Sequence, residues 1–215
     1  MSIRVRVMAH DLAASDDNSN ITYLSNWPSR PHYGHTVQYY RDASRFLDLL
    51  SRYVGMDLGR GDSYIIVAMP EHRQGLAERL ELRGFNLAVL RTRGTYIELD
   101  AAEVLDQLMT RGMMSRLRPG AFNAVMGPML DRAAETSGHT RVYGEMVALL
   151  WAAKNAPAAL SLEQAWNTLL AKHQFTLLCA YPLAAFEGRR SAARSMAAVS
   201  ACHQEVVEAE AAIRA

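Results

Sequence analysis

The sequence has few of the features that mark specialised classes of protein. Only two of its 215 residues are cysteines, too few for a disulfide framework, so we expect free thiols in a reducing cytoplasm. A formal net charge of +1 provides no strong field to attract nucleic acid or an anionic membrane. No run approaches the roughly 18 apolar residues of a membrane span, and the N-terminus lacks the apolar stretch of a signal peptide.

What is present is the composition of a globular protein, with 50% hydrophobic and 21% charged residues. Residues 1–30 contain many Asp, Ser and Asn residues and predict a flexible N-terminal arm. Residues 31–188 hold the regular patterns and predict one α/β domain. Residues 189–215 are rich in alanine and predict a C-terminal helix of the same domain, with Val199, Val206 and Ile213 on one face.

Apolar segments of strand length alternate with segments of helical periodicity. The segment 63–68 is mostly apolar, as in a strand that is buried on both faces. This alternation predicts right-handed crossovers and a three-layer α/β fold with a mainly parallel, doubly wound sheet. Ligands of such sheets bind at the carboxyl ends of the strands. The predicted strands cover residues 35–40, 63–68, 85–90, 96–99, 141–146 and 175–181.

Several helix starts are predicted from their capping residues. Asp42 has the position of an N-cap after the first strand, and Pro70 suits the first turn of a helix. Asp100 ends a strand and is best interpreted as another N-cap. Ser161 and Gln164 form a capping-box pattern, which predicts that a helix begins there.

The turn after residues 63–68 is where an ATPase of this fold class has its phosphate-binding loop. That loop needs glycines that let backbone N–H groups wrap a phosphate, a lysine, and a Ser or Thr for Mg²⁺. The residues present are Met69-Pro70-Glu71-His72-Arg73, with none of these features. Pro70 removes an N–H donor, and Glu71 places a negative charge where an anion would bind. A standard phosphate loop is excluded, while nucleotide binding through other contacts stays open.

Six stretches of the chain resemble the MEDS domain, which is named for methanogens, methylotrophs and the dichloromethane-dehalogenase regulator. The Gly-Glu-Met run and the Leu-Leu-Cys-Ala-Tyr run are the most distinctive, and the resemblance covers about residues 32–186. The matching stretches are residues 34–40, 69–73, 94–101, 141–151, 162–167 and 175–181.

The resemblance implies a RecA/KaiC-like fold with a degenerate P-loop, in agreement with the loop described above. It also implies a sensory domain for small organic ligands, including hydrocarbon derivatives, that is usually joined to a histidine kinase or a DNA-binding module. The sequence contains no kinase motif and no helix-turn-helix, so we expect signalling through a separate kinase or regulator protein. Neither a cofactor nor a metal is expected.

Four candidate ligand-binding residues belong to the ends of two strands. Glu71, His72 and Arg73 follow the strand 63–68, and Glu145 ends a later buried strand. His72 can hydrogen-bond a ligand; the alternative is a partly exposed histidine at a helix start. Glu145 can accept a hydrogen bond from a ligand or pair with an arginine such as Arg73, Arg91 or Arg141, because a buried carboxylate must be paired or neutral.

Two further candidates, His35 and Tyr181, lie on the first and the last predicted strands of the domain. His35 is a candidate ligand contact, with a structural histidine as the alternative. Tyr181 can line a pocket at the carboxyl end of its strand, and Cys179 on the same face is interpreted as core. His32 and His35 have an i, i+3 spacing, but the pattern offers no two further ligands, so no zinc site is predicted.

Three functions follow as hypotheses. The first is a ligand-sensing domain without turnover. The second is an interaction module, with the face of the final helix forming a homodimer or partner seam. The third is an enzyme that uses His72 and Glu145 as an acid/base pair, which requires both side chains within reach of one point.

Overall fold

The computed structural model describes residues 33–112, 115–187 and 192–207. Its centre is a six-stranded sheet in the order β3-β2-β4-β5-β1-β6, in which every pairing is parallel. Every residue of β2 and β4 is buried, as are all but the last residue of β5 and four of the seven residues of β1. The strands are β1 (Gly34–Tyr40), β2 (Ser63–Ala68), β3 (Tyr96–Asp100), β4 (Thr140–Gly144), β5 (Phe175–Pro182) and β6 (Glu205–Val207).

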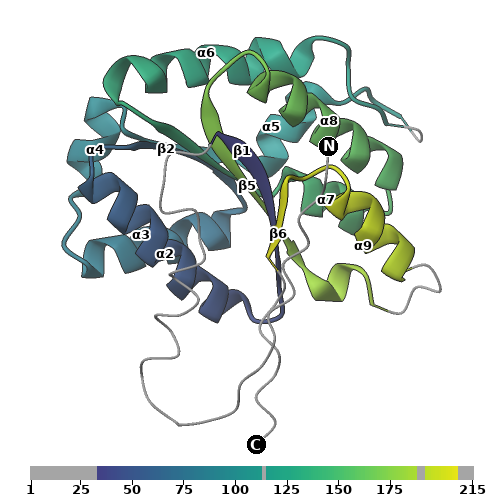
Figure 1. The fold of residues 1–215 in the computed structure, drawn as a ribbon, viewed down its shortest axis with the longest axis horizontal. Coiled ribbons are helices and arrows are strands. Elements are labelled where there is room, and N and C mark those ends of the chain that lie inside the picture. The colour runs from purple at the N-terminus through teal and green to yellow at the C-terminus, as the bar shows by residue number, and fades with distance from the viewer. Residues whose placement is uncertain (1–32, 113–114, 188–191, 208–215) are drawn as a thin grey trace, which may run out of the picture.

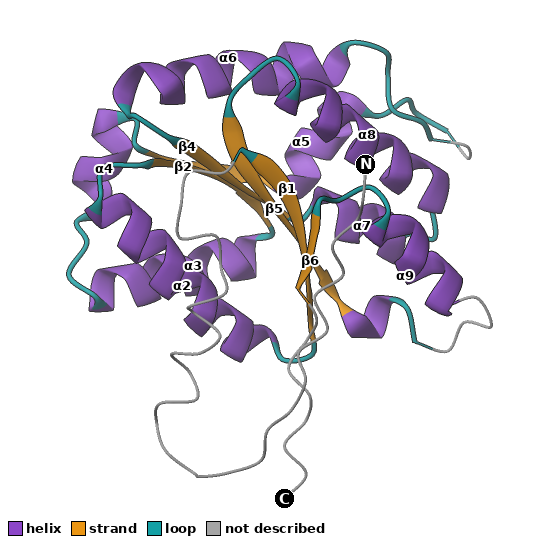
Figure 2. Cartoon of the chain, in the orientation of Figure 1, coloured by secondary structure: helices purple, strands orange, loops and turns teal. Residues whose placement is uncertain are grey.

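Helices cover both faces of the sheet and complete the predicted three-layer α/β fold (Figures 1 and 2). One face packs against α2, α3 and α4, and the other against α5, α6, α7, α8 and α9. Within the described part of the chain, none of the helices is long and apolar enough to cross a membrane. The helices are α2 (Ala43–Gly59), α3 (Pro70–Leu82), α4 (Leu87–Arg93), α5 (Ala101–Leu108), α6 (Ala121–Thr136), α7 (Met146–Ala152), α8 (Ala156–Leu170), the 3-10 turn η1 (Leu183–Ala185) and α9 (Ala192–Ser200).

Local sequence explains where most of these helices begin. The Asp42 carboxylate accepts the backbone N–H of Arg45, and the Asp100 carboxylate accepts two N–H groups of α5, so both predicted N-caps are confirmed. Pro70 is the first residue of α3, as predicted. The helix predicted to start at Ser161 begins earlier, because the Asn155 side chain caps α8.

Two other predictions from the sequence are wrong. Residues 85–90 do not form a strand, because Asn86 caps α4 and the chain turns helical from Leu87. The Ala-rich final helix ends at Ser200 and is followed by a turn and by β6, so Val199 and Val206 do not share a helix face. Ile213 and the predicted N-terminal arm of residues 1–30 lie outside the described residues.

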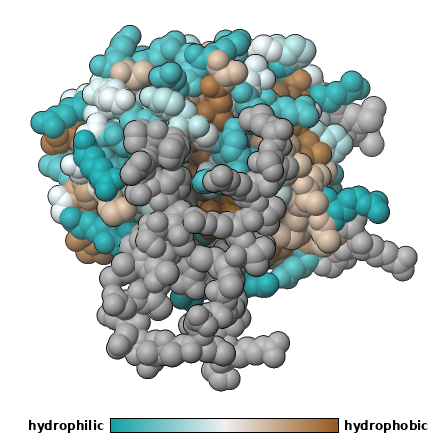
Figure 3. All heavy atoms as spheres, viewed as in Figure 1, coloured by the Kyte–Doolittle hydropathy of each residue, from teal (hydrophilic) through white to brown (hydrophobic). Residues whose placement is uncertain are grey.

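The surface drawn in Figure 3 is mainly hydrophilic where the described residues are visible, with hydrophobic residues showing in small groups. Large hydrophobic side chains that are exposed are scattered along the described chain, on different elements. Single exposed hydrophobic residues are normal on a globular protein and do not mark a binding surface. They are Tyr33, Met56, Met69, Leu82 and Val89.

A buried ion pair fastens α2 to the sheet near the amino ends of the strands. The Arg141 Nε lies 3.1 Å from Asp57 Oδ2 and 2.8 Å from Asp62 Oδ2, and the side chains of Arg141 and Asp57 are only 6% and 5% exposed. The Tyr64 hydroxyl donates a further hydrogen bond of 2.8 Å to Asp57. Burial raises the pKa of the Asp57 carboxyl, and the Arg141 charge opposes this effect.

Replacing Arg141 should therefore destabilise the fold strongly. In Arg141→Met the buried Asp57 loses its cation, and we expect the free energy of unfolding to fall by about 3–5 kcal/mol in urea titrations. The control is Arg41→Met, which breaks the exposed pair of Arg41 and Glu187, whose side chains are 61% and 66% exposed. Its cost should stay below about 1 kcal/mol. If the two variants lose similar amounts of unfolding free energy, the buried ion pair of Arg141 does not have this structural role.

Candidate functional site

The candidate site lies at the carboxyl edge of the sheet, between the turns that follow β2 and β4. These two strands are neighbours in the sheet. The chain after β2 leaves toward the face covered by α3, whereas the chain after β4 leaves toward the face covered by α7. Diverging connections of this kind mark the position at the sheet edge where parallel α/β domains commonly bind ligands.

The Glu145 carboxylate lies at this edge of the sheet. Glu145 is 3% exposed and directly follows β4, as the N-cap residue of α7. Its Oε2 atom accepts the backbone N–H of Met69 at 2.9 Å, and its Oε1 atom accepts the Tyr143 hydroxyl. Glu145 thus accepts the hydrogen bond of the Met69 backbone N–H at the start of α3, and its negative charge lies at that helix start. This charge opposes the binding of a phosphate in the same place.

His72 is the partner of Glu145 that reaches solvent. Its Nδ1 atom contacts Glu145 Oε1, and its side chain is 18% exposed. The hydrogen bond with Glu145 raises the pKa of the His72 imidazole above its ordinary value, although burial works in the opposite direction. Its ring meets the ring of Tyr40 edge-on at 6.4 Å, and Tyr40 stacks on Phe46 at 4.6 Å. The imidazole of His72 is therefore oriented by its hydrogen bond with Glu145 and is flanked by the ring of Tyr40.

Arg73 and Glu71 lie beside this pair in different roles. The Arg73 guanidinium donates to Asp100 Oδ2 at 2.8 Å, which ties α3 to the start of α5. Hydrogen bonds from the backbone of Glu103 and Ala102, together with Arg73, lower the pKa of the Asp100 carboxyl. Glu71 is exposed in the first turn of α3. The arginines considered as partners of Glu145 bind other carboxylates, Arg91 that of Glu98 and Arg141 those of Asp57 and Asp62.

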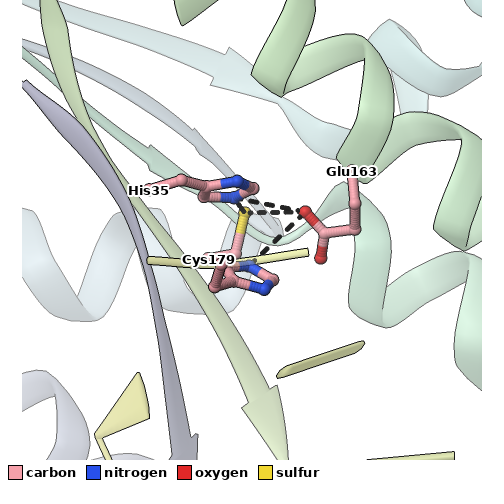
Figure 4. Close-up of side chains that lie close together, drawn as sticks. His35, Glu163 and Cys179 are labelled. Carbon is pink, nitrogen blue, oxygen red and sulfur yellow. Dashed lines mark hydrogen bonds and ion pairs between the residues drawn. The ribbon is translucent and has the colours of Figure 1, made fainter. Parts of the chain in front are cut away.

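His35 and Tyr181 belong to a second, fully buried cluster on the opposite face of the sheet. His35 projects from β1 and Cys179 from the neighbouring β5, while Glu163 reaches them from α8 (Figure 4). The His35 Nε2 atom lies 3.2 Å from Glu163 Oε2 and 3.2 Å from Cys179 Sγ. His203, from the turn before β6, places its Nε2 atom 3.6 Å from Glu163 Oε2.

Burial governs the ionisation of this cluster. It raises the pKa of the Cys179 thiol well above its usual range and lowers that of His203 to about 4. Burial also opposes the ionised form of Glu163, but the hydrogen bond with His35 and the nearby histidines outweigh it and lower the pKa of that carboxyl. The Tyr181 hydroxyl donates to Glu163 Oε1 at 2.6 Å, so Tyr181 orients a carboxylate instead of lining an open pocket.

The structure thus separates the six predicted residues. His72 and Glu145 are in contact, Arg73 and Glu71 lie next to them on α3, and His35 and Tyr181 are in the other cluster. Glu163 and His203 were not among the residues predicted from the sequence. A signal for Glu163 was present, because a lone acidic residue stood among the apolar residues of its helix. The sequence contained no such signal for His203, because residues around it were predicted to belong to the C-terminal helix.

A pocket of about 270 Å³ lies elsewhere, at the amino edge of the sheet. Thr140 and Phe175, the first residues of β4 and β5, line it together with Tyr33, His139 and His173. Burial lowers the pKa of His139. The pocket contains none of the six predicted residues, and the carboxyl edge is the place where the polar groups of the site converge.

Fold and site together define a class: a three-layer parallel α/β domain with a buried carboxylate at the carboxyl edge of its sheet. Within that class the chain belongs to the MEDS family, the methanogen/methylotroph, DcmR sensory domain, whose model matches residues 34–204. The family resemblance noted in the sequence is confirmed. The relation to RecA and KaiC stays a prediction, and comparison with curated proteins gives no match.

The pKa of His72 is a direct test of the site. We expect it to lie above the ordinary value for histidine in the wild type and to fall in Glu145→Gln, where the carboxylate is lost. NMR titration of the imidazole resonances measures both values.

The free energy of unfolding should depend on pH through the same imidazole, that of His72. A histidine whose pKa is raised by folding stabilises the native state fully below its unfolded pKa of about 6.5, and the contribution is lost as the pH rises through the folded pKa. The difference in unfolding free energy between wild type and His72→Gln should therefore shrink from about pH 6 upward. A difference that is constant or grows with pH would contradict this assignment.

Proposed function

We propose that the chain is a non-catalytic sensory domain that binds a small organic ligand at the carboxyl edge of the sheet, near the ends of β2 and β4. The chain belongs to a sensory family, and the domain would pass its signal to a separate kinase or regulator in the cytoplasm. The single observation that carries the proposal is the His72–Glu145 pair, a polar group with a buried anchor and one partly exposed end. No cofactor is part of the proposal.

The geometry of His72 suggests the chemistry of the ligand. Because Nδ1 contacts Glu145, the other ring nitrogen, Nε2, is the atom directed to a ligand, and none of the hydrogen bonds among the described residues uses it. A protonated imidazole donates through Nε2 and thus favours a ligand with an acceptor oxygen or a similar electronegative atom. The partly exposed ring of Tyr40, which is supported from below by the buried Phe46, favours a small apolar body.

The groups at the start of α3 suit a nucleotide poorly. A phosphate at the start of α3 would meet the Glu145 carboxylate and the exposed Glu71, and Pro70 offers no N–H donor. The ligand is therefore expected to be neutral or weakly polar, as the resemblance to hydrocarbon sensors also implies.

An enzyme with His72 and Glu145 as an acid/base pair is the second candidate, because their contact satisfies its geometric requirement. A binding domain should return its ligand unchanged after prolonged incubation, whereas an enzyme would convert it. The adaptor hypothesis is weaker than the sequence suggested: Val199, one residue of its seam, is fully buried in the core. A homodimer that uses other surfaces stays a prediction.

Ligand binding should depend on His72. A thermal-shift screen with methanol, short alcohols and ketones, chlorinated methanes and nucleotides should find a small organic compound that raises the melting temperature. In His72→Gln we expect the affinity for that compound to fall by roughly tenfold or more, the effect of losing one charge-assisted hydrogen bond. Isothermal titration calorimetry measures the difference.

The matched control is His173→Gln. His173 is also a partly exposed histidine with a carboxylate partner, Asp131 at 3.2 Å, but it lies at the amino edge of the sheet. Its replacement should leave the affinity unchanged. If the compound binds His72→Gln as tightly as the wild type, or if only His173→Gln loses binding, the site is misplaced.

A further inference from the structure

The cluster of His35, Glu163, Cys179 and His203 has the dimensions of a metal-binding cage. Each side chain offers one ligand atom, and these four atoms all lie within 4.8 Å of one another. Zinc binds nitrogen and oxygen ligands at about 2.0–2.2 Å and sulfur at about 2.3 Å, so the edges of a tetrahedral site measure roughly 3.3–3.6 Å. The closest separations in the cluster are 3.2 Å and 3.6 Å.

Neighbouring groups orient both histidines with Nε2 toward the centre of the cluster. The Nδ1 atom of His203 lies 2.8 Å from the carbonyl oxygen of Val199, so Nδ1 carries the proton and Nε2 the lone pair. The Nδ1 atom of His35 lies 3.0 Å from the side-chain oxygen of Asn167. Asn167 is itself fixed, because its amide donates to the carbonyl of Cys202 at 2.8 Å. Metal-binding histidines are typically held in this way by an acceptor at the second ring nitrogen.

This orientation leaves acceptor atoms in the cluster without a positively charged partner. With its Nδ1 atom protonated, His203 directs its Nε2 lone pair toward the carboxylate of Glu163, 3.6 Å away. The Nε2 atom of His203 is buried and lacks a hydrogen-bond partner, and its side chain is 0% exposed. An unsatisfied lone pair beside a carboxylate is costly in a buried place, and a bound cation removes the cost.

The ligand set also selects the ion. Two neutral imidazoles, one carboxylate and one thiolate balance the charge of a divalent ion, so the buried site becomes neutral overall. Mixed nitrogen, oxygen and sulfur ligands do not suit Mg²⁺ or Ca²⁺, which prefer oxygen. Four protein ligands in a closed tetrahedron are the arrangement of structural zinc sites.

We propose that His35, Glu163, Cys179 and His203 bind one divalent transition-metal ion in a closed tetrahedral site, with Zn²⁺ as the best-fitting ion. Binding releases the thiol proton of Cys179 to solvent. This proposal does not depend on the ligand role of His72, and it replaces the expectation from the sequence that the protein has no metal.

The site would fasten the end of the described chain to the sheet. His203 lies between α9 and β6, and the other three ligands come from β1, β5 and α8. Gln204, the next residue, hydrogen-bonds the backbone of His35 in both directions. The pairing of β6 with β1 covers only three residue pairs, so the ion would supply much of its attachment.

The full chain, purified without chelators, tests the proposal. Elemental analysis should find about one zinc per chain, or the chain freed of metal should take up about one equivalent of Zn²⁺ or Co²⁺. Co²⁺ in the site should show the strong visible bands of tetrahedral coordination and a thiolate charge-transfer band in the near ultraviolet. A chelator should lower the melting temperature and speed amide exchange in β6. If the chain binds neither Zn²⁺ nor Co²⁺ at about one ion per chain, the proposal is wrong.

The second cysteine provides a control that does not require the site to be damaged. Cys202 is half-buried, and its Sγ atom lies 3.5 Å from the carbonyl oxygen of Ala198, outside the cluster. Cys202→Ser leaves Cys179 as the only thiol of the chain, and the charge-transfer band should persist. Loss of that band in Cys202→Ser, or its survival in Cys179→Ser, would show that Cys179 is not the ligand.

Histidine variants give an independent readout. His203→Gln should weaken Zn²⁺ binding by about 100-fold or more, because a first ligand is removed. His139→Gln changes another buried histidine, which donates to or accepts from Thr176 at 2.8 Å and is not in the cluster, and should keep the wild-type affinity. Equal affinities in the two variants would exclude His203 as a ligand.

Discussion

Buried carboxylates are the constraint on which this structure depends. Glu163, Asp57 and Glu145 are all less than a tenth exposed, and a charge taken out of water is costly unless donors or cations surround it. Each of the three has partners on other elements of the chain, so meeting its needs brings distant segments together. The hydrophobic core supplies most of the stability of such a domain, and these three groups add specific polar contacts between particular segments.

The compensation differs among the three, and so does its consequence. Asp57 has a buried arginine and a tyrosine, a closed arrangement with a structural role. Glu145 has a histidine that reaches solvent, so its environment changes when something binds to that histidine. Glu163 has two histidines and a thiol, all inaccessible. The partly open arrangement suits sensing, and the fully enclosed one suits a resident ion. A sensory family can thus use the same type of buried charge for two purposes.

The sequence predicted those parts of the fold that local chemistry determines. The buried strand Ser63–Ala68 and the N-caps Asp42 and Asp100 each follow from a few adjacent residues. Residues 85–90 have strand-like composition, yet a helix forms there because the Asn86 side chain caps its first turn. His72 and Glu145 were predictable as a pair, because both follow buried strands. The cluster around Glu163 was not, because its members come from four elements whose neighbourhood depends on strand order.

The order of the strands also has a consequence for biosynthesis. β1 pairs with β5 and β6, but β2, β3 and β4 all come between them in the chain. During translation the apolar residues of β1 therefore leave the ribosome long before their partners exist. Such a strand must wait unpaired, with its edges exposed to other chains. Slow, late closure of the sheet is the expected cost of this topology, since non-local pairing delays folding. Production of this protein should accordingly be sensitive to temperature, to chaperone supply and to the rate of synthesis.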